Sequence, residues 1–287
     1  MATPGRRLRD AWAGGAIPVP GVFCPLVAKL AERLGFPAVY LSGAALSATL
    51  GVPDIGLVTA TEFADAARAI SAASPLPLLC DADTGFGEAI SVERTVRLYE
   101  SAGAAGLHLE DQEMPKRCGH LSGKSLVEPE VMVSKLRAAV AARVDPAFVL
   151  IARTDARGVA GFDDAVRRAR LYVEAGADMV FPEALEGEEE FAAFARALPG
   201  VPLLANMTEF GRSPPIDRDR LAGLGYRIAL YPVSALRAAL RATERVFSDI
   251  LNKGHQRDQI GAMLTRRELY ELLDYDGYEE RDRGYFG

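Results

Sequence analysis

The sequence contains little cysteine, histidine or tryptophan: three, three and one residues in a chain of 287. The cysteines Cys24, Cys80 and Cys118 are odd in number and lack the spacing of a structural zinc site. This pattern argues against a disulfide scaffold and a zinc module. We therefore expect a protein of the reducing cytoplasm.

Long apolar runs and a surplus of positive charge are also missing. No run of about eighteen apolar residues occurs, so we expect no membrane span. The segment Met1–Asp10 has three arginines without an apolar stretch behind them, which is unlike a secretory signal. The net charge of −6 argues against general nucleic-acid binding, so the expected partner is a small molecule.

Short apolar runs rich in Val, Leu and Ile alternate along the chain with longer stretches rich in Ala and Arg. Hydrophobic residues make up 49% of the sequence, enough for a large core. The short runs predict strands: Ile17–Pro20, Ala38–Ser42, Pro77–Asp81, Gly106–Glu110, Val149–Arg153, Met179–Glu183, Pro202–Asn206 and Ile228–Tyr231. The stretches between and after them predict helices: Pro25–Leu34, Thr61–Ala73, Val92–Ala102, Pro129–Arg143, Asp164–Ala175, Glu188–Ala197, Arg218–Leu224, Ser234–Lys253 and Gln256–Leu273.

Eight strands that alternate with helices indicate a parallel sheet, because parallel strands need long crossovers. Eight such units in 287 residues predict an α/β fold, a closed (β/α)8 TIM barrel forming one domain over 1–287. Residues 254–287 exceed what eight units need and are predicted to form a C-terminal helical extension, with a loosely ordered tail from Tyr275 to Gly287. The alternative, an open doubly wound sheet, calls for a Gly-rich loop after the first strand, and Pro20–Cys24 does not provide one.

Polar side chains stand at the carboxyl ends of the predicted strands, where barrel enzymes place their active sites. A single polar residue there could be a helix cap or a loop hydrogen bond. Seven strand ends together indicate an active site, and their polar residues are Tyr40 and Ser42, Asp81, Glu110, Arg153, Glu183, Asn206 and Tyr231.

Two aspartates mark the end of the third predicted strand. Asp81 and Asp83 are two residues apart, so the strand must end between them if both side chains face one site. Carboxylates together with water and substrate oxygens suit Mg²⁺, which rarely uses a full cage of protein ligands. Glu110 could join them through water. The alternative is a turn aspartate before Gly85.

Arg153 and Cys118 are the strongest single candidates for binding and for proton transfer. The planar guanidinium of Arg153 can bind a substrate carboxylate bidentately, or it can form a salt bridge with Glu183 or Asp155. Cys118 lies in a polar, glycine-containing loop between Arg117 and His120. A thiol in that setting offers an acid/base group beside an anion site. Cys24 and Cys80 are interpreted as packing residues.

Five motifs in these positions resemble the isocitrate lyase/phosphoenolpyruvate mutase superfamily, and within it the 2-methylisocitrate lyase family. They are Asp81–Gly87, His108–Gln112, Lys116–His120, Ala152–Asp155 and Asn206–Gly211. Phe181–Ala184 and Tyr231–Arg237 also resemble the lyases. One departure is the loop Ser42-Gly43-Ala44, which reads Ser-Gly-Gly in most of the family and is one residue longer there.

The resemblance implies Mg²⁺ dependence, with Mn²⁺ as an alternative, and a homotetramer whose C-terminal helices swap between subunits. It implies that Asp81 and Asp83 position the metal, with Glu110 in its outer shell. It also implies that a tricarboxylate substrate is bound by Ser42, Gly43, Ala44, Cys118, Gly119, His120, Arg153, Glu183, Asn206, Met207, Thr208, Arg237 and Arg266.

The reaction that the resemblance implies is cleavage of 2-methylisocitrate to pyruvate and succinate, a step of propionate catabolism in the methylcitrate cycle. Cys118 would act as the general acid, and Tyr40 and Asp54 are the two candidates for the base. Other activities of the superfamily stay open, namely those of isocitrate lyase, dimethylmalate lyase, oxaloacetate decarboxylase and carboxyphosphonoenolpyruvate phosphonomutase. The non-enzymatic alternative is a catalytically silent barrel that acts as a binding subunit.

Overall fold

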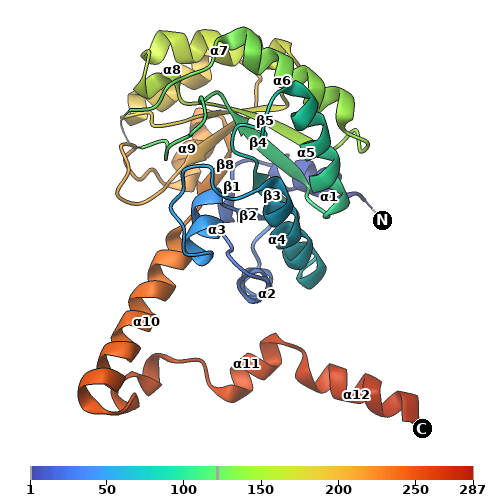
Figure 1. The fold of residues 1–287 in the computed structure, drawn as a ribbon, viewed down its shortest axis with the longest axis vertical. Helices are drawn as coiled ribbons and strands as arrows, with labels where there is room; N and C mark the ends of the chain where they lie inside the picture. Colours follow the sequence, from blue (N-terminus) through green and yellow to red (C-terminus); the bar gives the residue numbers. More distant parts are fainter. Residues whose placement is uncertain (1, 121–122, 287) are drawn as a thin grey trace.

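Eight parallel strands form one sheet that curls into a barrel in the computed structural model, which describes residues 2–120 and 123–286 (Figure 1). Hydrogen-bonded neighbours follow the order β1-β8-β7-β6-β5-β4-β3-β2. A single parallel bridge between Gly21 and Tyr40 joins the two end strands, β1 and β2. The strands are β1 (Ile17–Pro20), β2 (Val39–Leu41), β3 (Leu78–Asp81), β4 (Gly106–Glu110), β5 (Val149–Thr154), β6 (Met179–Pro182), β7 (Leu203–Asn206) and β8 (Tyr226–Tyr231). The predicted (β/α)8 barrel is confirmed, and each strand end lies within two residues of its prediction.

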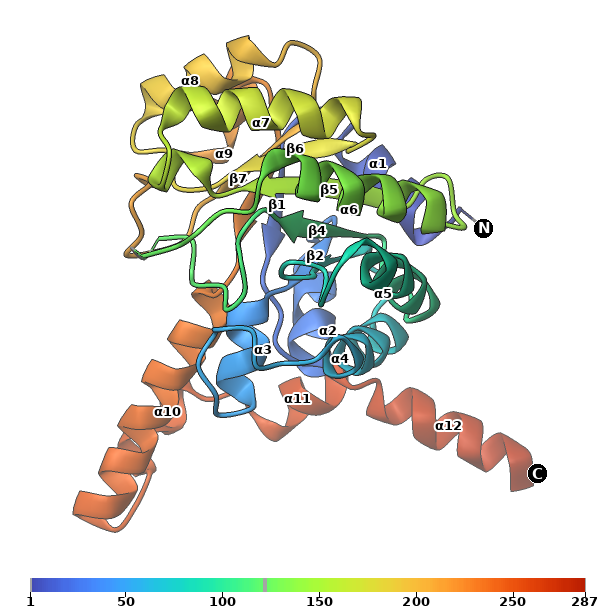
Figure 2. The same cartoon turned by 45° about the horizontal axis from the view of Figure 1, so that its top comes forward.

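Helices cover the outside of the barrel between the strands, as Figure 2 shows most clearly for α5 to α8. They are α2 (Pro25–Arg33), α3 (Gly43–Thr49), α4 (Ala60–Ala73), α5 (Ala89–Ser101), α6 (Pro129–Ala142), α7 (Phe162–Glu174), α8 (Glu188–Ala197) and α9 (Arg218–Leu224), with a 3₁₀ turn η1 (Ala156–Gly158) after β5. The sequence prediction missed α3, which begins directly after its Ser42 cap and so follows the end of β2 without a connecting loop.

A helix that the sequence analysis did not predict, α1 (Pro4–Trp12), packs against the amino-terminal ends of the strands. Leu8 is fully buried and Trp12 nearly so, and both belong to the apolar cluster inside the barrel. Arg9 Nε donates to the carbonyl of Ala147, just before β5, at 2.8 Å. This end of the barrel is therefore filled, and the opposite, carboxyl-terminal end is left for a site.

The outer core lies between the strands and the surrounding helices. Phe63 on α4 and Tyr99 on α5 are buried there at 6.4 Å between ring centroids. A fully buried phenylalanine side chain contributes about 1.5–3 kcal/mol through removal of apolar surface from water. Tyr99 Oη also donates to the carbonyl of Asp81 at 3.0 Å, so α5 fixes the end of β3.

The chain after β8 leaves the barrel as an extended arm, residues 234–286, drawn in orange and red in Figure 1. It contains α10 (Ser234–Lys253), the 3₁₀ helix η2 (Arg257–Ala262), α11 (Arg266–Leu272) and α12 (Tyr275–Phe286). The predicted single helix Gln256–Leu273 is wrong, because Met263 is extended and Thr265 starts a new helix with a capping box to Glu268. The predicted loose tail is wrong too, since residues 275–286 are helical.

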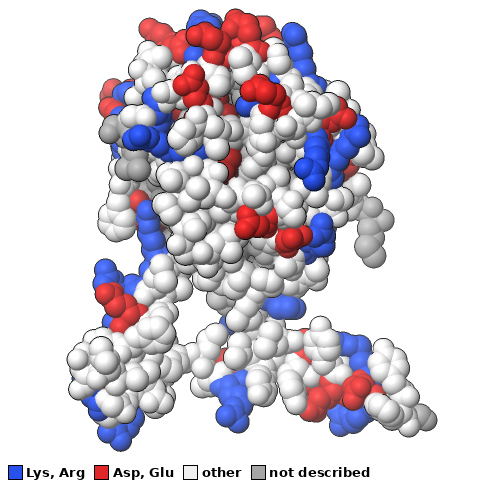
Figure 3. Space-filling view, viewed as in Figure 1, with Lys and Arg blue, Asp and Glu red and all other residues white. Residues whose placement is uncertain are grey.

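Large apolar side chains of the arm are exposed in the isolated chain. Phe247 is 66% exposed and Leu251 is 84% exposed, and uncharged surface dominates the lower end of α10 in Figure 3. Over the barrel, acidic and basic residues are interspersed (Figure 3). No helix in the described part of the chain combines the length and the apolar character that a membrane crossing requires.

Candidate active site

A pocket of about 580 Å³, including its part open to solvent, lies at the carboxyl ends of the strands. Its walls come from most of the strand ends and from the loop after β4. The lining residues are Tyr40, Ser42, Ala44, Asp54, Asp81, Lys116, Arg117, Cys118, Gly119, His120, Arg153, Phe181, Glu183, Asn206, Thr208, Leu230, Pro232, Val233 and Arg237.

Most of the residues predicted from the sequence meet in this pocket, but six do not line it: Gly43, Asp83, Glu110, Met207, Tyr231 and Arg266. Gly43, Asp83 and Glu110 lie directly behind the wall and contact residues that do line it. The Met207 side chain points away, because its sulfur accepts a hydrogen bond from the Ile216 amide within the outer core. Arg266 is exposed on α11, far along the arm, so a single chain does not bring it to the pocket.

Asp81 and Asp83 are positioned by the turn that follows β3. Asp81 Oδ1 accepts from the Asp83 amide at 3.0 Å, and Asp81 Oδ2 accepts from the Gly43 amide at 3.0 Å. Asp83 has a φ of 45°, a left-handed conformation that belongs to the turn rather than to the strand. The strand therefore ends between the two aspartates, as their spacing predicted.

Lys116 brings a positive charge to these carboxylates. Its Nζ lies 2.7 Å from Asp83 Oδ1 and also donates to Asp54. Burial alone would lower the pKa of Lys116, but the surrounding carboxylates, Glu110 and Asp83 foremost, raise it well above the ordinary lysine value. The lysine is therefore charged and partly offsets the acidic cluster.

The acidic cluster has the donor set that suits a hard divalent cation. Burial, reinforced by the Asp81 carboxylate, raises the pKa of Asp83 to about 7. Glu110 Oε1 is buried and has no hydrogen-bond partner in the described residues. No three acidic, histidine or cysteine side chains in that part of the chain are close enough to hold a metal alone. Two carboxylates with water and substrate oxygens fit Mg²⁺ under these conditions.

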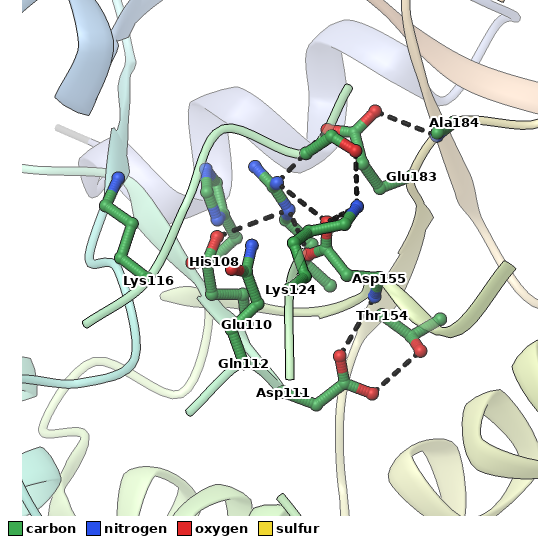
Figure 4. Close-up of polar contacts among 12 residues, drawn as sticks. His108, Glu110, Asp111, Gln112, Lys116, Lys124, Thr154, Asp155, Glu183 and Ala184 are labelled. Atoms are coloured by element: carbon green, nitrogen blue, oxygen red, sulfur yellow. Dashed lines mark hydrogen bonds and ion pairs between the residues drawn. The ribbon is translucent and has the colours of Figure 1, made fainter. Parts of the chain in front are cut away.

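Arg153 is fixed by the carboxylates of Glu110, Asp155 and Glu183, all three of which are labelled in Figure 4. Asp155 accepts from Nε at 2.9 Å and from Nη2 at 3.2 Å, while Glu110 lies 3.3 Å from Nε and Glu183 3.3 Å from Nη2. The guanidinium also lies 5.1 Å from the centroid of Phe181. The salt-bridge alternative drawn from the sequence is thus confirmed, because Arg153 pairs with Asp155 and Glu183. Arg153 also lines the pocket, and binding of a substrate carboxylate by this residue stays a prediction.

His120 and Asn206 share the carboxylate of Glu183. The Arg212 amide donates to His120 Nδ1 at 3.0 Å, so the proton of the neutral ring lies on Nε2. Nε2 is 3.1 Å from Glu183 Oε1, and Asn206 Nδ2 donates to Glu183 Oε2 at 3.2 Å. Glu183 orients both side chains in this way and presents them to the pocket.

Gly119 allows the Cys118 loop to lie against this cluster. A Cβ atom at position 119 would come within 2.4 Å of Glu183 Cγ and 2.5 Å of Arg153 Nη2. Only glycine fits there, and the close approach brings the neighbouring Cys118 and His120 into the pocket wall. The sequence analysis singled out this loop because it is polar and contains glycine. The structure shows why glycine is needed at position 119.

Tyr40 and Asp54, the two predicted base candidates, both line the pocket but differ in burial. Burial, followed by the Asp81 carboxylate, raises the pKa of Tyr40 well above its ordinary value, so Tyr40 is protonated. Its hydroxyl lies 3.3 Å from Asp81 Oδ2 and 2.7 Å from His108 Nε2. Asp54 is only partly buried and is paired with Lys116.

Several lining residues were not predicted as site residues. Lys116 belongs to a motif that the sequence analysis singled out, so its signal was present. Phe181, Leu230, Pro232 and Val233 form the apolar part of the wall, and they were missed because an apolar residue at a strand end looks like an ordinary core position. Asp155, which contacts the lining residue Arg153, was considered only as a salt-bridge partner, and Lys124, which contacts Gly119, was not singled out.

Comparisons of the sequence with a family model and with individual known proteins agree on one family. The family model for phosphoenolpyruvate phosphomutase matches residues 11–251. The 2-methylisocitrate lyase of Aeropyrum pernix is 54% identical over 283 residues, which cover 98% of this chain and 91% of that protein.

Solved structures agree with the sequence comparison. A crystal structure of 2,3-dimethylmalate lyase superposes with a TM-score of 0.93 at 36% identity, covering 100% of this chain and 97% of that one. Phosphonopyruvate hydrolase in complex with oxalate and Mg²⁺ superposes with a TM-score of 0.90 at 35% identity, covering 100% of both chains. The chain therefore belongs to the phosphoenolpyruvate mutase/isocitrate lyase superfamily, among the 2-methylisocitrate lyases.

Proposed function

We propose that this chain is a Mg²⁺-dependent carbon–carbon lyase that cleaves 2-methylisocitrate to pyruvate and succinate. The observation that carries the proposal is one pocket that combines the Asp81 carboxylate, the Cys118 thiol and the donors Arg153, His120 and Asn206. A binding subunit without catalysis needs no thiol beside a metal-type carboxylate pair. The family membership supports the same reaction class.

Asp81 and Asp83 are the residues proposed to hold Mg²⁺, with Glu110 behind them. The buried, unpartnered Glu110 Oε1 supports this assignment, and a superfamily relative has been crystallised with Mg²⁺ and oxalate. When bound, the metal supplies Lewis-acid polarisation of the hydroxyl and carboxylate oxygens of the substrate.

Cys118 is proposed to supply the proton that completes cleavage. The carbon–carbon bond breaks, the hydroxyl loses its proton to a base, and the bonding pair stays on the carbon that becomes part of succinate. The thiol then protonates that carbon, a step of a kind worth about 10²–10⁴ in rate. Asn206, whose amide nitrogen carries a second hydrogen besides the one that it gives to Glu183, stabilises the charge that spreads into the adjacent carboxylate.

Asp54 is the better of the two base candidates. Tyr40 is buried and protonated, so it can donate a hydrogen bond but cannot accept the hydroxyl proton. Asp54 lines the pocket with a side chain that is 19% exposed, and its partner Lys116 can orient it. The assignment predicts that Asp54→Asn lowers the rate much more than Tyr40→Phe does.

The decisive experiment is proton NMR of the purified protein with Mg²⁺ and, separately, 2-methylisocitrate, isocitrate and 2,3-dimethylmalate. Pyruvate and succinate from the first substrate, with much slower turnover of the others, would support the proposal. Faster turnover of another substrate would reject 2-methylisocitrate as the preferred one and direct attention to Ala44, whose methyl group lines the pocket. Lack of turnover with all three would favour another reaction of the superfamily.

The arm is proposed to complete the site in a homotetramer. Its exposed apolar side chains suit burial against another subunit, and a swapped arm would give Arg266 a route to a neighbouring pocket. Light scattering of the full chain should give four subunits. A monomer in solution at micromolar concentration would contradict both the assembly and the role of Arg266.

A further inference from the structure

Lys124 is a buried lysine close to the pocket but not part of its lining. Its side chain is 2% exposed. Nζ donates to the carbonyl oxygen of Gly119 and, at 2.8 Å, to Asp155 Oδ1. Because Gly119 separates Cys118 from His120, the carbonyl that Lys124 holds belongs to the loop that presents the thiol. Burial of an ammonium group is costly unless it is paired, so these two contacts fix where Lys124 can lie.

Asp155 connects this lysine to the pocket wall (Figure 4). The same carboxylate accepts from Lys124 and, through both oxygens, from Arg153. It is fully buried. One group therefore positions both the arginine from β5 and, through Lys124, the loop after β4.

Asp155 itself is held in place from behind by Asp111. The Asp155 amide donates to Asp111 Oδ1 at 2.9 Å, and the Thr154 hydroxyl donates to Asp111 Oδ2 at 2.7 Å. Tyr172 on α7 donates to the same oxygen at 2.9 Å. The end of β5 is thus anchored to β4 and α7, which makes Asp155 a rigid point to which a loop can be attached.

We infer that Lys124 is a positioning residue, which holds the Cys118 loop in its working place by linking the Gly119 carbonyl to Asp155. Proton transfer requires the thiol within hydrogen-bond reach of one carbon atom, so a small displacement of the loop has a large effect on rate. The inference rests on the proposed function for the role of Cys118; the contacts of Lys124 do not depend on it.

The test compares the full-length protein with its Lys124→Met variant, which keeps the length of the side chain and removes the charge and the donors. The readout is the rate at which iodoacetamide alkylates Cys118, followed by peptide mass spectrometry, with Cys24 in the same molecule as the reference. Loss of hydrogen bonds from a charged group should raise the rate at Cys118 by about tenfold and leave Cys24 unchanged.

Two further variants control for folding. Arg143→Met also removes a partly buried cation from a carboxylate, Asp178, but at the amino-terminal end of the barrel. It should leave alkylation of Cys118 unchanged. Lys124→Gln keeps a donor without the charge and serves as the test if Lys124→Met does not fold. An unchanged rate at Cys118, or an equal rise at both cysteines, would overturn the inference.

Steady-state kinetics of the same variant test whether the position of the Cys118 loop matters for catalysis. In Lys124→Met, kcat for cleavage should fall by about 100-fold, the size expected for misplacement of a reacting group. The affinity for Mg²⁺ should stay the same, because the metal-type carboxylates do not contact Lys124. An unchanged kcat would overturn the positioning role. If the wild-type protein does not cleave 2-methylisocitrate, the proposed function fails, while the alkylation experiment still decides whether Lys124 holds the loop.

Discussion

The barrel and the arm contain similar helices but stabilise them differently. Helices α4 to α7 of the barrel each bury at least four side chains. In the arm, the 20-residue α10 buries only Leu236, and α12 buries none. The barrel therefore has its own core, whereas the arm buries little else besides Leu272 of α11, which contacts α2, and depends more on local features such as the Thr265–Glu268 capping box. Helical pattern in the sequence indicates a helix in both cases but does not reveal what it packs against.

The largest expected effect is a loss of activity in a variant whose barrel and arm both stay folded. Cys118→Ser should lower the rate of cleavage by about 10²–10⁴, since the hydroxyl is a poor general acid in place of the thiol. Circular dichroism, light scattering and Mg²⁺ binding should match the wild type. Near-full activity in the NMR assay would remove Cys118 from the mechanism.

The second prediction tests the claim that the barrel has its own core. Phe63→Ala should lower the free energy of unfolding by about 3–5 kcal/mol, because a cavity replaces a ring that is 1% exposed. Ile90 on α5 is 76% exposed, and Ile90→Ala, the matched control, should change the free energy of unfolding by no more than about 0.5 kcal/mol. Chemical denaturation measures both. Similar losses would show that burial in the barrel does not govern its stability.

Removal of the residues after Lys253 tests whether the arm is needed for assembly of the proposed homotetramer, for folding of the barrel, or for both. A chain that ends at Lys253 should lose the homotetramer in light scattering and keep the far-ultraviolet and thermal signature of the barrel. The cleavage activity of the shortened chain should also fall, because Arg266 is then absent. Arg266→Ala in the full chain is the control: it should lower activity and leave the assembly intact. Unfolding of the shortened chain would show that the barrel needs the arm.

The smallest expected effect is local to the arm. Thr265→Ala removes the cap of α11 and should reduce its local stability by about 1 kcal/mol. Hydrogen exchange should speed up at the amides of residues 266–272 and stay the same in α5. A uniform change over both helices would mean that the arm and the barrel unfold as one unit.

Much of the fold and part of the site could be predicted from the sequence. The alternation of apolar runs and helical stretches was sufficient to predict the barrel, because few other architectures contain eight repeated strand–helix units. The pocket residues at strand ends followed from the rule that barrel sites lie there. Some pieces were missed or misjudged: α1 and α3 were not predicted, although α1 buries Leu8 and Trp12 on one face, and the break before α11 depends on the extended Met263.

The sequence by itself determined where the strands lie along the chain, the polar character of their carboxyl ends and the position of the loop that carries Cys118. These features depend on residues that are neighbours along the chain. Only the tertiary structure decided the pairing of Lys116 with Asp54, 62 residues away, and of Lys124 with Asp155, 31 residues away. The same holds for the burial of the Met207 side chain. The physical reason is that periodicity specifies which face a side chain occupies, whereas ion pairs depend on how loops from different strands meet.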